Sequence, residues 1–100
     1  MITEVKLAKL SKDMEESAVV AFSVKVGDEV KKGDILFEIE TDKACVEIES
    51  PADGYVRHIL VKPGFVVGVG TTILLLAEKD EDIPQRLLDS LTAAIPPQQA

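Results

Sequence analysis

The sequence has one cysteine, no tryptophan and few aromatic residues, three Phe and one Tyr among 100 residues. A single cysteine excludes an intramolecular disulfide and is typical of a reducing compartment, and no Cys or His cluster has the spacing of a zinc site. Because the chain is nonetheless 46% hydrophobic, its core must consist mainly of Val, Ile, Leu and Ala. Such a core suits thin packed layers better than a large substrate pocket.

Basic residues are also scarce, with 11 Lys and Arg against 18 Asp and Glu and a net charge of −7. This charge repels phosphate backbones and anionic membrane surfaces, so we expect neither nucleic acid nor membrane as a partner, but proteins with basic surfaces. No apolar run approaches the roughly 20 residues that span a bilayer, and Met1 is not followed by a secretory signal pattern. We therefore expect a cytoplasmic protein.

Residues 5–77 consist of short apolar or alternating runs that Gly, Pro, Asp and Ser interrupt, a pattern typical of an all-β domain. A chain of this length supports one modest core. The clearest strands are expected at 2–8, 18–24, 35–40, 45–49, 54–61 and 72–77.

The first half of this region resembles the second when the chain is shifted by 37 places. Two such halves would each expose an apolar face, and pressing these faces together with pseudo-twofold symmetry would bury both. The repeat therefore predicts a small sandwich or flattened barrel. The identities are Val24 with Val61, Lys25 with Lys62, Gly27 with Gly64, Val30 with Val67, and Gly33 with Gly70.

Residues 82–95 differ from the rest, because their apolar residues follow helical spacing. Asp82 is expected to cap a short amphipathic helix, Pro84 is tolerated in its first turn, and Pro96 and Pro97 end it. The helix either packs on the sandwich, pairs with another subunit or stays marginal. We divide the chain into a domain at 1–79 and a helix with the start of a linker at 80–100. The apolar edge is Ile83, Leu87, Leu88, Leu91 and Ile95.

The most informative stretch is a predicted hairpin whose arms, 35–40 and 45–49, flank the turn Thr41-Asp42-Lys43-Ala44. Asp is favoured in such turns, and Lys43 would stand exposed at the tip. A lysine amine there can accept an activated acyl group, and the rigid strands give a mobile arm a fixed base. Alternation places one apolar face on the two arms: Ile35, Phe37 and Ile39 with Ala44, Val46 and Ile48.

The stretch from Gly33 to Ala44, followed by Ser50-Pro51 and Asp53-Gly54, resembles the lipoyl domain of dihydrolipoamide acyltransferases, the E2 component of 2-oxo acid dehydrogenase complexes. The similarity runs over 2–79 and includes the half-to-half symmetry. It implies a barrel-sandwich hybrid of two four-stranded antiparallel sheets, with Lys43 at a hairpin tip and both termini at the far end.

The resemblance also implies a carrier without catalytic activity of its own. Lipoate in amide linkage to Lys43 would pass acyl groups and reducing equivalents between a thiamine-diphosphate-dependent E1 decarboxylase, an E2 acyltransferase core and the E3 flavoprotein dihydrolipoamide dehydrogenase, after attachment by a lipoate ligase. Attachment would change the net charge from −7 to −8. The flanking Asp42 and Ala44 favour a pyruvate or acetoin complex.

Three alternatives remain open at this point. Biotin domains share the fold but usually have Met on both sides of the lysine, the glycine-cleavage H protein is typically longer, and an unmodified adaptor would not need the Asp-Lys-Ala tip.

In the family, the loop between the first two strands helps the decarboxylase to recognise its carrier, although a plain solvated connection explains it as well. The candidate recognition residues are Leu10, Ser11 (where glycine is common), Lys12, Asp13, Met14, Glu40 and Thr41.

Overall fold

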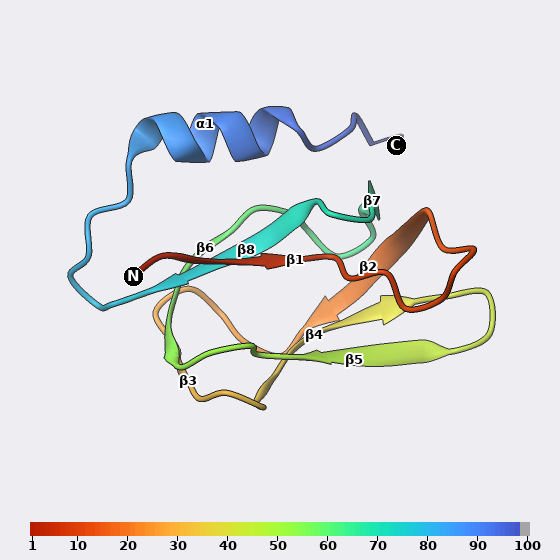
Figure 1. Ribbon diagram of the computed structural model, residues 1–100, viewed down its shortest axis with the longest axis horizontal. Coiled ribbons are helices and arrows are strands. Elements are labelled where there is room, and N and C mark those ends of the chain that lie inside the picture. Colours follow the sequence, from red (N-terminus) through yellow and green to blue (C-terminus); the bar gives the residue numbers. More distant parts are fainter. Residues whose placement is uncertain (99–100) are drawn as a thin grey trace.

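Two antiparallel four-stranded sheets pack face to face in the computed structural model, which describes residues 1–98 (Figure 1). The all-β prediction is confirmed. One sheet has the strand order β1-β8-β6-β3, and the other has the order β5-β4-β2-β7. The first sheet comprises β1 (Thr3–Lys6), β8 (Thr72–Ala77), β6 (Gly54–Ile59) and β3 (Glu29–Val30). The second comprises β5 (Cys45–Glu49), β4 (Ile35–Glu40), β2 (Glu16–Phe22) and β7 (Val66–Gly68).

Three of the six expected strands have the expected bounds, namely β4, β5 and β8. The other three are shorter or shifted by up to two residues, as strand ends usually are. The strands β3 and β7 were not among those expected, because they have only two and three residues and show no usable alternation. They nevertheless complete the edges of the two sheets.

The internal repeat is confirmed by the hydrogen bonds. The Gly27 amide donates to the Val56 carbonyl oxygen at 2.8 Å, and 37 places on, the Gly64 amide donates to the Val19 carbonyl oxygen at 2.6 Å. Both glycines have positive φ, +100° and +96°, a backbone conformation that L side chains rarely adopt. The bulge between Val56 and His58 likewise repeats the one between Val19 and Ala21. The two halves are therefore related by a pseudo-twofold axis.

The same symmetry fixes where the hairpin tip lies. β4 pairs with β5 as β8 pairs with β1, because Ile39 opposite Val46 has its counterpart in Leu76 opposite Thr3. The turn that joins β4 to β5 therefore corresponds to the gap between the end of β8 and the start of β1. The tip lies at one end of the sandwich, while the beginning of β1 and the end of β8 lie at the other (Figure 1).

Both halves contribute side chains to the core between the sheets. Val30 and Val67, which are equivalent in the repeat, are 2% and 0% exposed. The rings of Phe22 and Phe37 pack with their centroids 5.8 Å apart. Burying apolar side chains from both sheets is the main favourable contribution to the stability of such a sandwich.

The C-terminal helix, α1 (Gln85–Ala93), packs on the parent domain, and Ile95 just after it contacts the core. The predicted cap at Asp82 is wrong: Pro84 occupies the N-cap position and no side chain caps the helix. Asp82 therefore lies two residues too early to reach the free N–H groups of the first turn. Among residues 1–98, no helix has the length and apolar character needed to cross a membrane.

Replacing Gly27 by Ala should destabilise the domain by about 1–2 kcal/mol, because a Cβ is strained at positive φ whatever space surrounds it. Gly68→Ala is the matched control, since an added Cβ there meets only the Glu15 carbonyl oxygen at 3.7 Å. We expect its effect to stay within about 0.5 kcal/mol. Urea unfolding of both variants measures the difference, and equal losses would contradict this account of the repeat.

Candidate functional site

The tip of the β4–β5 hairpin holds Lys43 in an exposed position, as predicted. The turn is closed by the Thr41 amide, which donates to the Ala44 carbonyl oxygen at 2.8 Å. Asp42 and Ala44, on either side of the lysine, are exposed as well. An enzyme that has to enclose this amine therefore meets three exposed residues at the end of a two-stranded ribbon.

The turn is organised by the hydroxyl of Thr41 rather than by Asp42. The hydroxyl donates to the Ala44 carbonyl oxygen at 2.9 Å and accepts from the amides of Lys43 and Ala44 at 3.3 and 3.2 Å. Within residues 1–98, the Asp42 carboxylate forms no hydrogen bond with a backbone group of the turn. Sequence reasoning relied on Asp42 for the turn, although the pattern of a Thr two residues before the lysine also indicates a side-chain-stabilised turn.

Two further features fix the base of the tip. The buried hydroxyl of Ser17 in β2 donates to the Glu40 carbonyl oxygen, at the residue where β4 ends. Val46 and Ile48 of β5 are half-buried and pack against the core. The lysine thus stands on a ribbon that is tied to the neighbouring strand and to the interior.

The predicted apolar face of the first arm holds only in part. Ile39 and Phe37 are buried and lie opposite Val46 and Ile48, as expected. A bulge between residues 35 and 37 interrupts the alternation, so that Leu36 is 0% exposed. A bulge places two consecutive residues against one partner, which is why strict alternation fails there.

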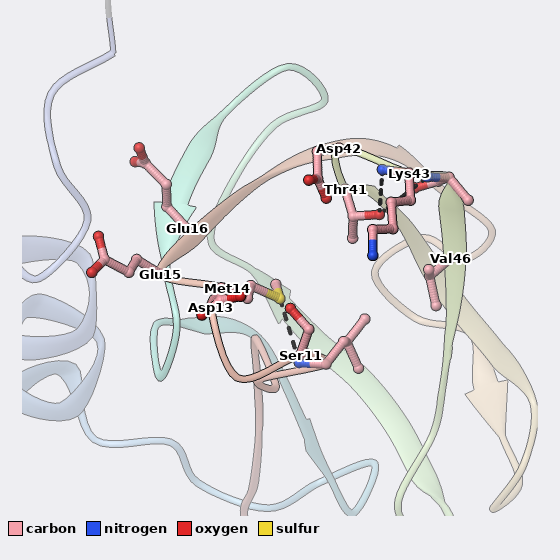
Figure 2. Close-up of a pocket in the computed structure, with 11 residues that line it drawn as sticks. Ser11, Asp13, Met14, Glu15, Glu16, Thr41, Asp42, Lys43 and Val46 are labelled. Carbon is pink, nitrogen blue, oxygen red and sulfur yellow. Dashed lines mark hydrogen bonds between the residues drawn. The ribbon is translucent and has the colours of Figure 1, made fainter.

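A groove of about 610 Å³ separates the tip from the loop between β1 and β2. The side chain of Lys43 extends into this space, toward Met14 and Ser11 of the loop (Figure 2). Of the ten predicted site residues, eight line the groove, whereas Lys12 and Glu40 do not. The lining residues are Leu10, Ser11, Asp13, Met14, Glu15, Glu16, Thr41, Asp42, Lys43, Ala44 and Val46.

The loop that forms the second wall is an asymmetric feature of an otherwise symmetric fold. It spans residues 7–15, while the equivalent connection between β5 and β6 spans only 50–53. The Met14 amide donates to the Ser11 carbonyl oxygen at 3.2 Å, and the Leu10 amide donates to the Met14 sulfur at 3.4 Å. Since no non-glycine residue among 1–98 has positive φ, Ser11 adopts an ordinary backbone conformation that does not require glycine. The extra length lies at the lysine end.

The site is strongly acidic apart from its lysine. Lys43 is the only basic residue among those that line the groove, beside Asp13, Glu15, Glu16 and Asp42. On the outer face of the hairpin, Glu38 and Glu47 lie directly opposite each other, and Glu40 and Glu49 extend this face. Like charges placed opposite each other are destabilising. Because β5 is an edge strand, this acidic face also hinders edge-to-edge pairing with another sheet. It suits a partner with a basic surface.

Comparison with known proteins agrees with this geometry. The family described as "Biotin-requiring enzyme", the biotin/lipoyl group, matches residues 3–76. The chain belongs to this family. The match ends one residue before β8 ends, so it covers the sandwich and leaves out α1.

Several similar proteins are components of one kind of complex. The chain is 46% identical over 86 residues to the dihydrolipoyllysine-residue acetyltransferase component of the pyruvate dehydrogenase complex of Zymomonas mobilis, a match that covers 85% of this chain and 20% of that protein. It is 38% identical over 82 residues to the chloroplastic component 5 of Arabidopsis thaliana, covering 82% and 18%. The chain thus spans about a fifth of the length of these relatives.

Solved structures confirm the barrel-sandwich fold. The lipoyl domain of the 2-oxoglutarate dehydrogenase complex of Azotobacter vinelandii superposes with a TM-score of 0.63 at 28% identity, covering 75% of this chain and 95% of that one. The urea carboxylase of Kluyveromyces lactis has a TM-score of 0.52 at 26% identity, covering 75% and 7%. The resemblance to lipoyl domains that the sequence indicates is therefore confirmed, and the family includes biotin-dependent members.

Replacing Thr41 by Val should loosen the turn around Lys43, because Val keeps the side-chain shape but cannot form the three hydrogen bonds of the hydroxyl. We expect a loss of about 1 kcal/mol in stability and faster amide exchange at Lys43 and Ala44. Thr41→Ser retains the hydroxyl and should behave nearly as the native chain. Unchanged exchange in the Val variant would show that the hydroxyl does not organise the tip.

Proposed function

We propose that this chain is a lipoyl carrier domain in which lipoate is attached by an amide bond to the side-chain amine of Lys43. The observation that carries the proposal is the position of this amine, exposed at the end of a ribbon that Thr41 and Ser17 hold in place. Lipoate bound there supplies a disulfide that carries acyl groups and reducing equivalents. Asp42 and Ala44 flank the attachment point and are the residues that a modifying enzyme meets first.

The surroundings of Lys43 fit an amide-linked group. Neither of the two ion pairs found among residues 1–98 involves Lys43, so acylation breaks no such contact. The side chain lies beside the apolar residues Leu10, Met14 and Val46, which tolerate a neutral, extended arm. Acylation removes the one positive charge of the groove lining and takes the net charge from −7 to −8.

The proposed context is a 2-oxo acid dehydrogenase complex of the pyruvate or acetoin type. The partners would be the thiamine-diphosphate-dependent E1 decarboxylase, the E2 acyltransferase core, the E3 flavoprotein dihydrolipoamide dehydrogenase and a lipoate ligase. The pyruvate dehydrogenase relatives support this choice. The residues proposed for partner recognition are Leu10, Ser11, Lys12, Asp13, Met14, Glu40 and Thr41.

The chain acts in this proposal as a carrier and the reactions take place on other domains. In this proposal residues 1–79 are the carrier domain, and residues 80–100 are the helix and the start of a linker, of which 99 and 100 lie outside the described residues. A tethered arm raises the effective concentration of its substrate group at each partner in turn. Binding to the groove and the acidic hairpin then selects the partner.

Biotin is the competing modification, because the family includes biotin-dependent proteins and the fold matches a carboxylase. The tip favours lipoate, since Asp42 and Ala44 stand where biotin domains usually have Met. Enzymatic modification distinguishes the two directly.

Co-expression with a lipoate ligase should yield one lipoyl group per chain, located on Lys43 by intact-mass and fragment analysis, whereas a biotin ligase should leave the chain unmodified. Lys43→Ala should abolish modification, while Lys62→Ala, which removes an exposed lysine in another turn, should not. Because Lys43 is exposed and unpaired within residues 1–98, its replacement should change the free energy of unfolding by less than about 0.5 kcal/mol.

Two results would overturn the proposal. Modification by the biotin ligase alone would reassign the carrier to biotin, and lipoylation of another lysine would remove Lys43 from the site. A large loss of stability in Lys43→Ala would show that this side chain supports the fold.

A further inference from the structure

The strand β8 is buried at all six positions, which a two-layer sandwich alone does not explain. Side chains alternate between the two faces of a strand, and the opposite sheet covers only one of them. Leu75 and Ala77 are 0% and 3% exposed, yet they lie outside the core cluster between the sheets. In Figure 1, α1 runs along the side of this sheet that faces away from the other sheet. The five residues of the apolar edge of segment 83–95 are all half-buried, so this segment forms a third layer: Ile83, Leu87, Leu88, Leu91 and Ile95.

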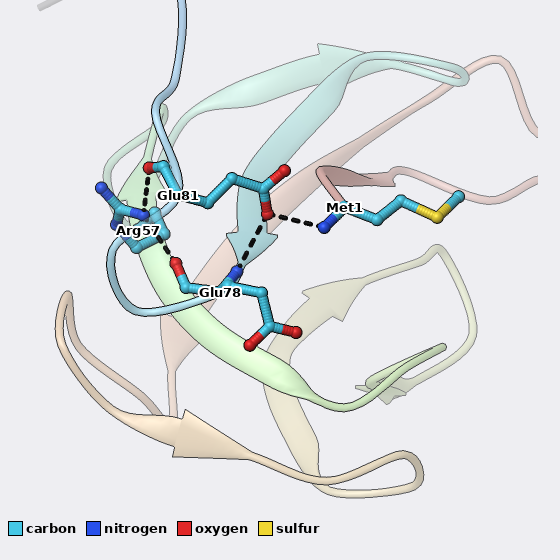
Figure 3. Close-up of polar contacts among 4 residues, drawn as sticks. All are labelled: Met1, Arg57, Glu78 and Glu81. Carbon is cyan, nitrogen blue, oxygen red and sulfur yellow. Dashed lines mark hydrogen bonds and ion pairs between the residues drawn. The ribbon is translucent and has the colours of Figure 1, made fainter.

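The start of the segment is held by Arg57 of β6 (Figure 3). One guanidinium nitrogen donates to the carbonyl oxygens of Glu78 and Glu81, at 2.7 Å each. The Glu81 carboxylate accepts hydrogen bonds from the Met1 ammonium at 2.7 Å and from the Glu78 amide at 3.1 Å. The contact with the ammonium lowers the pKa of the Glu81 carboxyl below its ordinary value. These contacts fix the turn from which the chain leaves the sandwich.

The end of the segment is held by Gln98. Its side-chain oxygen accepts from the Val66 amide at 2.8 Å, and its side-chain nitrogen donates to the Val66 carbonyl oxygen at 3.0 Å. These are the two backbone groups that an added strand would use at the free edge of β7. Pro96 and Pro97 have no backbone N–H to pair with that edge. The side-chain amide of Gln98 takes the place of a strand.

Gln98 docks at the lysine end of the molecule. Val66 lies opposite Ala18, Ala18 opposite Glu40, and Glu40 opposite Cys45, so one row crosses the sheet from the docking point to the base of the tip. Glu16 lines both the groove at Lys43 and a second pocket of about 500 Å³ beneath residues 96–98. The segment that leaves the sandwich opposite the tip therefore returns to it.

We propose that residues 82–98 act as a releasable strap that covers the free edge of β7 and the Glu16 side of the groove. A partner that closes over Lys43 from this side has to displace the strap. Docking itself follows from the contacts of Arg57 and Gln98, whereas its effect on partners rests on the proposed carrier function.

The helix of the strap has little stability of its own. The helix has nine residues, no side-chain N-cap and no fully buried residue. Isolated helices shorter than about 12–15 residues are barely stable in water, so a detached strap also loses its helix. Segments with few buried contacts open first in native proteins.

Amide hydrogen exchange of the unmodified chain tests the docking. In Gln98→Ala the Val66 amide should exchange at least about tenfold faster than in the native chain. Gln85→Ala is the matched control, because within residues 1–98 its side chain bonds only to Asp89 of the same helix, and it should leave Val66 unchanged. Equal exchange at Val66 in the native chain and in Gln98→Ala would overturn the proposal.

The single cysteine provides a distance test. A nitroxide on Cys45 stands three strand spacings from β7, about 14 Å, and should broaden the backbone signals of residues 95–98 in the native chain. The broadening should weaken in Gln98→Ala and persist in Gln85→Ala. No broadening of residues 95–98 in the native chain would exclude the docked strap.

The rate of lipoylation tests the effect on partners. If the ligase has to displace the strap, Gln98→Ala should be modified at least about threefold faster than the native chain and Gln85→Ala. Equal rates for the three proteins would contradict the proposal that the strap hinders access to Lys43, and they would leave the carrier assignment intact. Absence of modification at Lys43 would instead contradict the carrier assignment, and the exchange and broadening results would still decide whether the strap docks.

Discussion

The fold depends on the burial of two apolar faces, each too small to be stable alone, against each other. Backbone hydrogen bonds between the two halves, such as that from Gly27 to Val56 and its counterpart from Gly64 to Val19, fix the register of the strands. Register cannot slip by one residue without turning every buried side chain of a strand outward. The symmetry leaves one difference between the ends of the sandwich. A turn joins β4 to β5, whereas the equivalent strands β8 and β1 are not joined.

That difference distinguishes the lysine end of the sandwich from the opposite end. The lysine sits on the turn, the hydroxyls of Thr41 and Ser17 hold its base, and the long loop after β1 provides a second wall. The acidic residues around it give this end a negative charge, which suits a partner with a basic surface. A fixed base with one mobile side chain suits a group that has to visit several active sites, because only the arm has to be ordered at each visit.

The sequence predicted the hairpin, the exposed lysine and the symmetric halves. The alternation of apolar and acidic residues over 37–40, and the glycines that repeat 37 places apart, can be read directly from the sequence. It did not predict β3 and β7, which are too short to alternate, nor the bulge that buries Leu36. Asp82 was wrong as a cap because Pro84 takes the cap position. The contacts of Gln98 with Val66 join residues 32 apart in the chain, and no local pattern signals a side chain that takes the place of a strand.

Backbone and side-chain relaxation by NMR tests the rigid base most directly. If the hydrogen bonds of Thr41 and Ser17 hold the tip, the amides of residues 41–44 should have order parameters near about 0.85, as in the strands, while the Lys43 side chain moves freely. Order parameters below about 0.6 for these amides would contradict the account. The lysine would then stand on a flexible loop, and the arm would have no fixed base.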